Sequence, residues 1–121
     1  MSERELARRV PTQADFDLFA GISGDDNPIH VDPDFSSRTR FGRTVSHGML
    51  LYSWAWALLK AALPGQRPVS AQLMFPNPCY AGEEIRFVLE EAENQARVRV
   101  CRSEDGAELL LLETRMQQAG R

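Results

Sequence analysis

The stretch over residues 47–63 constrains the fold more than any other part of this chain, because it is apolar on every side. Its apolar residues are Met49, Leu50, Leu51, Trp54, Ala55, Trp56, Ala57, Leu58 and Leu59. Ser46 is a plausible N-cap for a helix here, and Pro64 followed by Gly65 predicts its end. A helix without a polar stripe has to be covered by other elements. We therefore predict a long central helix that the rest of the chain encloses.

Four segments with strand patterns follow this helix and can enclose it. Their apolar residues are Val69, Ala71, Leu73 and Phe75, then Ile85, Phe87 and Leu89, then Val98 and Val100, and finally Leu109 to Leu112. Turns are predicted at Glu93-Asn94 and at Asp105-Gly106. The expected fold class is α+β, with an antiparallel β-sheet wrapped around the long central α-helix. Because so small a sheet leaves open edges, we expect a second copy of the chain to cover them in a homodimer.

The segment before the central helix is predicted to be partly helical. Thr12 is an expected N-cap with an acidic residue at the capping-box position, and the short amphipathic helix after it ends at Gly21 or Gly24. Residues 25–35 hold two prolines within six residues, which predicts an ordered loop and not a helix. Residues 34–40 are expected to form one further helical turn.

Composition bounds the class of protein. The 121 residues suit a single domain over residues 1–121, and 43% hydrophobic with 26% charged residues favours a folded core. The net charge is -3 and both signs are interspersed, which argues against a nucleic-acid-binding surface. The charged start of the chain lacks the apolar region of a secretory signal, so a cytoplasmic location is expected. The apolar helix carries Ser53 and Lys60 and is too short for a membrane span.

Two neighbouring segments, GDDNPIHVDP and FGRTVSHGML, hold the titratable residues that could carry chemistry. On an α-helix, Asp25 and His30 would lie on faces about 140° apart. Pro28 removes that constraint, because it holds Asn27 extended and lets the carboxylate and the imidazole point at one spot. Such a pair can exchange protons with a substrate as general acid and general base.

Together these segments resemble the hydratase motif of the MaoC-like family, Gly-Asp-x-Asn-Pro-x-His with Asp-Pro soon after, then Phe-Gly and His-Gly-Met at the start of the central helix. The resemblance covers residues 21–51 closely. It implies a hotdog fold and (R)-specific hydration of trans-2-enoyl-CoA, or the reverse dehydration of (R)-3-hydroxyacyl-CoA, in fatty acid metabolism. It also implies Asp25 and His30 as the catalytic pair and the amide of Gly48 as the oxyanion donor, a role that a helix N-terminus suits. Acyl carrier protein is the alternative carrier of the acyl group.

Four further residues are candidate substrate contacts: Asn27, Arg43, Ser53 and Trp56. Arg43 forms a basic cluster with Arg38 and Arg40, which is either a solvated surface or a partner for the phosphates of coenzyme A. Some relatives place a serine two turns into the central helix, whereas this chain has Trp56 nearby. The indole either limits the length of the acyl tunnel or packs only against the sheet.

No metal and no cofactor are expected. The chain has only two histidines, without HxH or HxxxH spacing. Cys79 and Cys101 are isolated and are interpreted as buried or half-buried side chains. His47 is interpreted as a structural histidine, and Asn27 and Asp32 as organisers of the loop.

Two other functions stay open. A hotdog thioesterase would act on the same class of substrate, but such enzymes usually place Asp or Glu on the central helix, and residues 47–63 contain neither. A non-catalytic subunit of a hetero-oligomeric dehydratase is expected to lack Asp25 or His30, and both are present.

Overall fold

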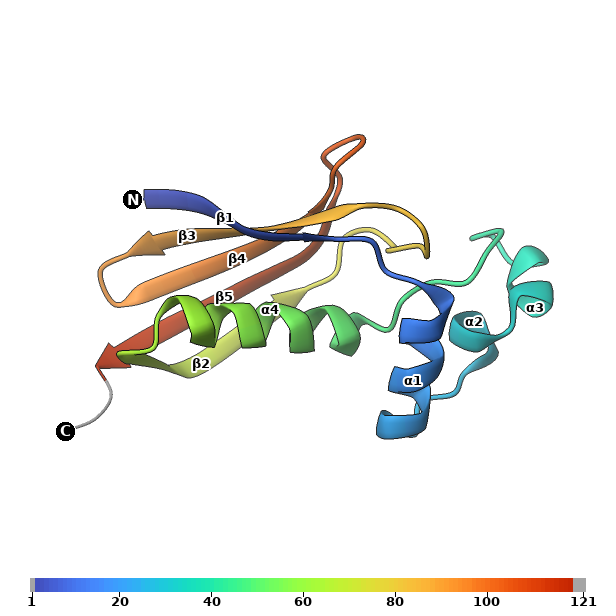
Figure 1. The fold of residues 1–121 in the computed structure, drawn as a ribbon, viewed down its shortest axis with the longest axis horizontal. Coiled ribbons are helices and arrows are strands. Elements are labelled where there is room, and N and C mark those ends of the chain that lie inside the picture. The colour runs from blue at the N-terminus through green and yellow to red at the C-terminus, as the bar shows by residue number, and fades with distance from the viewer. Residues whose placement is uncertain (1, 119–121) are drawn as a thin grey trace.

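Five strands form one antiparallel sheet, and the longest helix lies along one of its faces (Figure 1). The structure, a computed structural model, describes residues 2–118, so residues 1 and 119–121 of the predicted domain lie outside the described residues. The strands are β1 (Ser2–Arg9), β2 (Gln66–Met74), β3 (Ile85–Ala92), β4 (Gln95–Arg102) and β5 (Glu108–Gln118). Their order across the sheet is β1-β3-β4-β5-β2. The predicted α+β class and antiparallel sheet are confirmed.

The core lies between the inner face of the sheet and the helix α4 (Gly48–Ala62). Alternate side chains of β3, β4 and β5 point toward this helix, because successive residues of a strand face opposite sides. The buried side chains include Phe87, Val98, Leu110 and Leu112 on the sheet and Leu51, Ala55 and Leu59 on the helix. On the other flank of α4, Met49, Ser53 and Ala57 are exposed. One chain therefore encloses its helix from one side only.

The start of α4 differs from the prediction. Its N-cap is His47, which makes no side-chain capping hydrogen bond. The hydroxyl of Ser46 donates to the carbonyl of His47, and the amide of Ser46 donates to the carbonyl of Cys79 over 2.7 Å. Ser46 as the N-cap is therefore wrong, because the bond to Cys79 holds it in the segment before the cap.

Strand β1 was not among the four strands that the sequence predicted. It is an edge strand that pairs with β3 alone among the strands of residues 2–118, and most of its side chains face solvent, with Leu6 and Ala7 partly buried. Glu5 of β1 lies 3.7 Å from Arg86 of β3. Because charged side chains occupy this edge, the strand shows no apolar alternation by which the sequence could reveal it.

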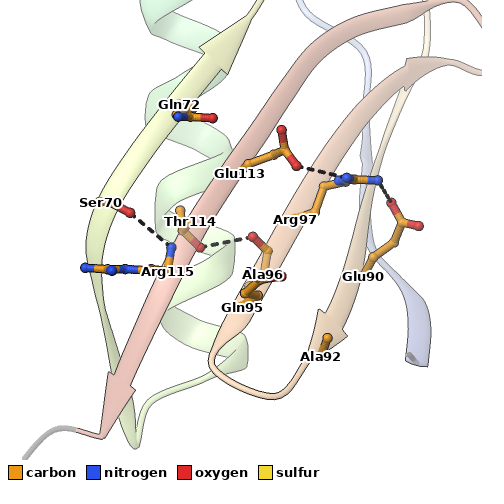
Figure 2. Close-up of a pocket in the computed structure, with 10 residues that line it drawn as sticks. All are labelled: Ser70, Gln72, Glu90, Ala92, Gln95, Ala96, Arg97, Glu113, Thr114 and Arg115. Carbon is orange, nitrogen blue, oxygen red and sulfur yellow. Dashed lines mark hydrogen bonds and ion pairs between the residues drawn. The ribbon is translucent and has the colours of Figure 1, made fainter.

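The face of the sheet that points away from α4 carries a row of ion pairs (Figure 2). A guanidinium nitrogen of Arg97 lies 2.9 Å from a carboxylate oxygen of Glu113, and another lies 3.8 Å from Glu90. Arg99 also contacts Glu90, over 3.0 Å. A groove of about 280 Å³ lies over this row. The ion pairs link β3, β4 and β5 on the solvent side of the core.

Three short helices lie beyond one end of the sheet (Figure 1), with His30 on the second of them and Asp25 in the loop between the first two. They are α1 (Gln13–Ser23), α2 (Pro28–Val31) and α3 (Pro33–Ser37). The prediction for α1 is confirmed: Thr12 and Asp15 form the capping box, and Gly24 ends the helix with a φ of 82°. The further helical turn predicted over residues 34–40 corresponds to α3.

The prediction that residues 25–35 form a loop without a helix is wrong. Both α2 and α3 begin with proline, whose fixed φ suits the first turn of a helix even though it restricts the residue before it. The side chain of Asn27 accepts from the amide of Ile29, and that of Asp32 accepts from the amide of Phe35. Asn27 and Asp32 therefore organise this segment as predicted, but as helix caps.

Strand β2 forms the other edge of the sheet and leaves apolar side chains in solvent. It is confirmed near its predicted place and pairs with β5 alone among the described strands. Val69, Met74 and the adjoining Phe75 are 42%, 58% and 44% exposed. An unpaired apolar edge of this kind is a surface that another chain can cover.

Several local predictions are confirmed. Asn94 and Gly106 take positive φ angles of 61° and 74° in the two predicted turns. Cys79 and Cys101 are both buried and free. No helix within residues 2–118 combines the length and the apolar character needed to cross a bilayer.

Candidate active site

A cavity of about 520 Å³ lies where the cluster of short helices meets the N-terminus of α4. Its walls come from the loop after α1, from the segment that leads into α4, and from residues 75–79 after β2. Three of the predicted site residues, Asp25, His30 and Gly48, line this cavity together. The tertiary structure therefore joins segments that are separated in the sequence.

The carboxylate of Asp25 and the imidazole of His30 face each other across a short gap. Asp25 Oδ2 lies 3.7 Å from His30 Nε2. This distance is too long for a direct hydrogen bond and suits a single bridging water. The side chain of Asp25 is 55% exposed, whereas that of His30 is 14% exposed. The pair thus has one member open to solvent and one member held inside the protein.

The ring of His30 is oriented from its far side by the backbone. Its Nδ1 lies 2.8 Å from the carbonyl oxygen of Val45, and the amide of Val45 donates to the carbonyl of Ile29 over 3.0 Å. Because a carbonyl oxygen only accepts, Nδ1 of His30 carries the proton. Nε2, the atom that faces Asp25, is therefore the nitrogen that can gain or lose a proton.

His47 lies buried beside this pair, with 2% of its surface exposed. Its ring stacks on the ring of His30 with centroids 3.9 Å apart, and its Nε2 lies 2.8 Å from the backbone oxygen of Asp25. Phe19 contacts the same ring edge-on at 4.9 Å. Burial lowers the pKa of His47 below its ordinary value of 6.5, and the nearby His30 lowers it further. The ring is therefore neutral near pH 7.

Gly48 stands at the first position of α4, against the ring of Phe75. A Cβ atom at this position would lie 2.9 Å from Phe75 Cε1. The first amides of a helix have no partner within the helix, and the N-cap His47 supplies none from its side chain. The amide at Gly48 thus belongs to a helix end that favours negative charge.

The three arginines of the basic cluster have different surroundings. Arg38 lies 2.8 Å from Asp34, and Arg43 lies 3.0 Å from Glu83. Arg40 lines the cavity and lies over the ring of Phe41 at 4.9 Å. Arg40 is therefore the member of the cluster that the geometry brings to the cavity.

The four predicted substrate contacts do not line this cavity. Arg43 also stacks over Tyr80 at 4.0 Å, and the hydroxyl of Ser53 donates to the carbonyl of Met49 on the exposed side of α4. Trp56 packs edge-on against Tyr52 at 5.8 Å. With Asn27 acting as a helix cap, all four stay predictions that the geometry of the cavity does not support.

A metal ion is a separate possibility, because ligand atoms of Asp25, His30 and His47 lie within 4.8 Å of one another. A nitrogen lone pair lies in the plane of its ring, and these two rings are stacked with 24° between their planes. Nε2 of His47 is also bonded to the backbone of Asp25. The two rings are therefore poorly arranged to share one ion, and the prediction of no metal stays a prediction.

Arg40 and Phe75 are among the cavity-lining residues that the sequence analysis did not identify. Arg40 was given no role of its own within the basic cluster, and Phe75 was taken only as a strand residue. The sequence around Phe75 does carry a signal for this role. Pro76 and Pro78 follow directly after a predicted strand, which predicts a stiff, extended segment that can form a cavity wall.

Comparison with known proteins bears on the class of protein. Residues 2–109 match the family model of the MaoC like domain. The (R)-specific enoyl-CoA hydratase of Aeromonas caviae is 39% identical over 79 residues, which are 64% of this chain and 59% of that protein. The 3-hydroxybutyryl-CoA dehydratase of Methylorubrum extorquens is 34% identical over 113 residues, 88% of this chain and 72% of that protein. The match thus spans little more than half of the Aeromonas protein.

Solved structures agree with these matches. The (R)-hydratase from A. caviae involved in PHA biosynthesis superposes with a TM-score of 0.85 at 28% identity, over 98% of this chain and 95% of that chain. An R-hydratase from Pseudomonas aeruginosa gives a TM-score of 0.76 at 27% identity, over 99% of this chain and 81% of that chain. The architecture is therefore the hotdog fold of the (R)-hydratases. The chain belongs to the MaoC-like dehydratase family, whose named members include hydratases and dehydratases.

Proposed function

We propose that this protein catalyses the (R)-specific hydration of trans-2-enoyl-CoA, or the reverse dehydration of (R)-3-hydroxyacyl-CoA. The observation that carries the proposal is the 3.7 Å gap between Asp25 Oδ2 and His30 Nε2, next to Gly48 in one cavity. The relatives from A. caviae and M. extorquens are named for this type of reaction.

The reaction adds the oxygen of water to C3 of the enoyl group and a proton to C2. A water within hydrogen-bond reach of both Asp25 and His30 loses a proton to one of them as its oxygen attacks C3. The other group, which holds a proton at the start, gives it to C2, and the proton taken from water then passes to that group across the 3.7 Å gap, so that atoms and charges balance. Water and the thioester supply everything the reaction consumes, and we propose no cofactor and no metal.

Negative charge develops on the thioester oxygen as water attacks, and the proposed donor to it is the amide of Gly48. Backbone amides at a helix N-terminus stabilise such a charge without reorganising. The missing side chain at residue 48 lets the carbonyl approach the backbone closely. The same amide would hold the oxygen in both reaction directions.

Arg40 supports a phosphate-bearing carrier for the acyl group. It is the cavity-lining member of the basic cluster, while Arg38 and Arg43 have carboxylate partners. A guanidinium group suits the phosphates of coenzyme A and also the phosphopantetheine of acyl carrier protein. The 3-hydroxyacyl-[acyl-carrier-protein] dehydratase of Arabidopsis thaliana is 34% identical over 96 residues, so both carriers belong in the test.

We also propose that the protein is a homodimer. The open edge of β2, the exposed Val69 and Met74, and the uncovered flank of α4 give one chain an apolar surface that a second copy can bury. The cytoplasmic location inferred from the sequence stays a prediction.

The test is turnover of a panel of trans-2-enoyl-CoA esters and one enoyl-acyl carrier protein, followed by loss of the enoyl absorbance. Chiral analysis of the product should give the (R)-3-hydroxyacyl thioester. A thiol reagent added in parallel reports release of free coenzyme A. Release of thiol without loss of the double bond would identify a thioesterase, and neither signal on any substrate would contradict the proposal.

A further inference from the structure

The loop that carries Asp25 needs a fixed support if its carboxylate is to stay in register with His30. Residues 24–27 are exposed throughout, and an exposed loop stays mobile unless a buried group holds it. The buried ring of His47 reaches this loop from the N-cap of α4 and bonds to the backbone oxygen of Asp25 over 2.8 Å. His47 therefore connects the loop to the core.

The hydrogen bond between His47 and Asp25 can run in one direction only. The acceptor is a carbonyl oxygen, so Nε2 of His47 carries the proton and Nδ1 of the neutral ring is bare. This Nδ1 is buried and has no hydrogen-bond partner among residues 2–118. A proton on Nδ1 would be unpaired and close to the ring of His30, so burial selects the tautomer that donates to Asp25.

The same ring also supports the other member of the pair. It stacks on the face of His30 at 3.9 Å, while the carbonyl of Val45 holds the edge of His30 at Nδ1. One buried side chain thus contacts both Asp25 and His30. It contacts the backbone oxygen of Asp25 and the ring face of His30, which leaves Asp25 Oδ2 and His30 Nε2 free to face each other. His47 is placed to set the distance between them.

We propose that His47 is a positioning residue, which holds the Asp25 loop and the His30 ring in register through its Nε2 bond and its stack. It transfers no proton in this scheme. The inference rests on the proposed function for its kinetic readout, whereas its structural readout is independent of any substrate.

Two variants separate the hydrogen bond from the ring. His47→Phe keeps a ring for stacking and removes the donor, so kcat should fall about 10- to 100-fold with KM nearly unchanged. His47→Gln loses the ring but places an amide N–H near the position of Nε2, so kcat should stay well above that of His47→Phe. Phe19→Leu is the matched control, because Phe19 touches the same ring but neither Asp25 nor His30 in the contacts described. It should lower the melting temperature and leave kcat unchanged.

The second readout is nuclear magnetic resonance of the histidine rings in the wild-type protein without substrate. His47 should show the Nε2–H tautomer with a slowly exchanging proton at neutral pH. In His47→Phe the amides of residues 24–27 should lose protection from exchange, and in His47→Gln they should keep most of it.

These outcomes keep the two proposals distinct. A wild-type protein that hydrates no enoyl thioester contradicts the proposed function, and the resonance data then decide the role of His47. Wild-type kcat in folded His47→Phe, or equal losses in the Phe and Gln variants, overturns the positioning role. Should His47→Phe fail to fold, an Nδ1–H tautomer or a rapidly exchanging ring proton in the wild type overturns it instead.

Discussion

The ring of Phe75 lies against the α-carbon of Gly48, so closely that a Cβ atom at residue 48 would meet Phe75 Cε1 at 2.9 Å. Phe75 belongs to the cavity wall after β2, and Gly48 opens the central helix. Glycine at residue 48 is therefore required for the packing of Phe75 in the cavity wall, and it also lets the substrate carbonyl approach the backbone in the proposed reaction. The two needs can be separated by mutation.

Gly48→Ala should fold but lose most of its hydration activity. The new methyl group displaces a half-exposed ring, and overpacking of this kind typically destabilises by about 1–3 kcal/mol. It also lies where the thioester oxygen is proposed to meet the amide. Adding Phe75→Ala should restore the melting temperature without restoring kcat. Wild-type kcat in the single variant would argue against the proposed oxyanion donor.

Replacing either member of the catalytic pair should lower the rate by orders of magnitude. Asp25→Asn and His30→Ala each remove a proton-transfer group, which typically lowers kcat by about 10²- to 10⁴-fold. Asp26→Asn is the control, because Asp26 is the exposed neighbouring carboxylate outside the cavity. Circular dichroism should show all three variants folded. An equal loss in Asp26→Asn would mean that the wrong carboxylate has been assigned.

The free energy of unfolding should decrease as the pH falls below 6.5, in part through His47. Burial lowers the pKa of this residue from 6.5, with His30 adding to the effect and the Asp25 carbonyl opposing it. Between the two pKa values the unfolded chain binds a proton that the folded chain does not, so stability is present above pH 6.5 and is lost as pH falls toward the folded pKa. Urea titrations of wild type and His47→Gln should show a smaller decrease in the variant. Parallel pH profiles in the two proteins would contradict this account.

The protein should be a dimer in solution through the edge of β2. Val69→Lys places a charge on this open apolar edge and should shift the mass measured by light scattering toward the monomer. Ile22→Lys is the matched control, because it introduces the same charge at a residue that is 74% exposed on α1, away from β2. Its mass should equal that of the wild type. A wild-type monomer at micromolar concentration is the result that excludes the dimer.

Trp56→Ala should lower stability without changing the preferred acyl length. Trp56 packs against Tyr52 and does not line the cavity, so its removal should act through lost packing. The ratio of kcat/KM for crotonyl-CoA to that for a longer enoyl-CoA should equal the wild-type ratio. A shift toward longer chains would instead support the tunnel role inferred from the sequence.

Elements with a strong periodic signal were predictable. The apolar helix, the first helix with its capping box, and the strands with apolar alternation all lie near their predicted residues. Strand β1 was not predictable from the sequence, because it is a charged edge strand whose pairing partner β3 lies far along the chain. Helix α2 and the start of α3 at Pro33 were missed because a proline restricts the residue before it and favours a helix start after it, and only the first effect was considered.

The residues of the site divide in the same way. The sequence by itself identified Asp25 and His30 as candidates, because their chemistry and their spacing around Pro28 lie within one short segment, and the resemblance of a second segment to the MaoC-like motif added Gly48. Only the tertiary structure decided that Arg40 and Phe75 line the same cavity and that Ser53 and Trp56 do not. It also showed that His47 bonds to the backbone of Asp25, a contact between residues 22 positions apart. Such contacts depend on how separate elements pack around the core, and a local pattern carries no record of that packing.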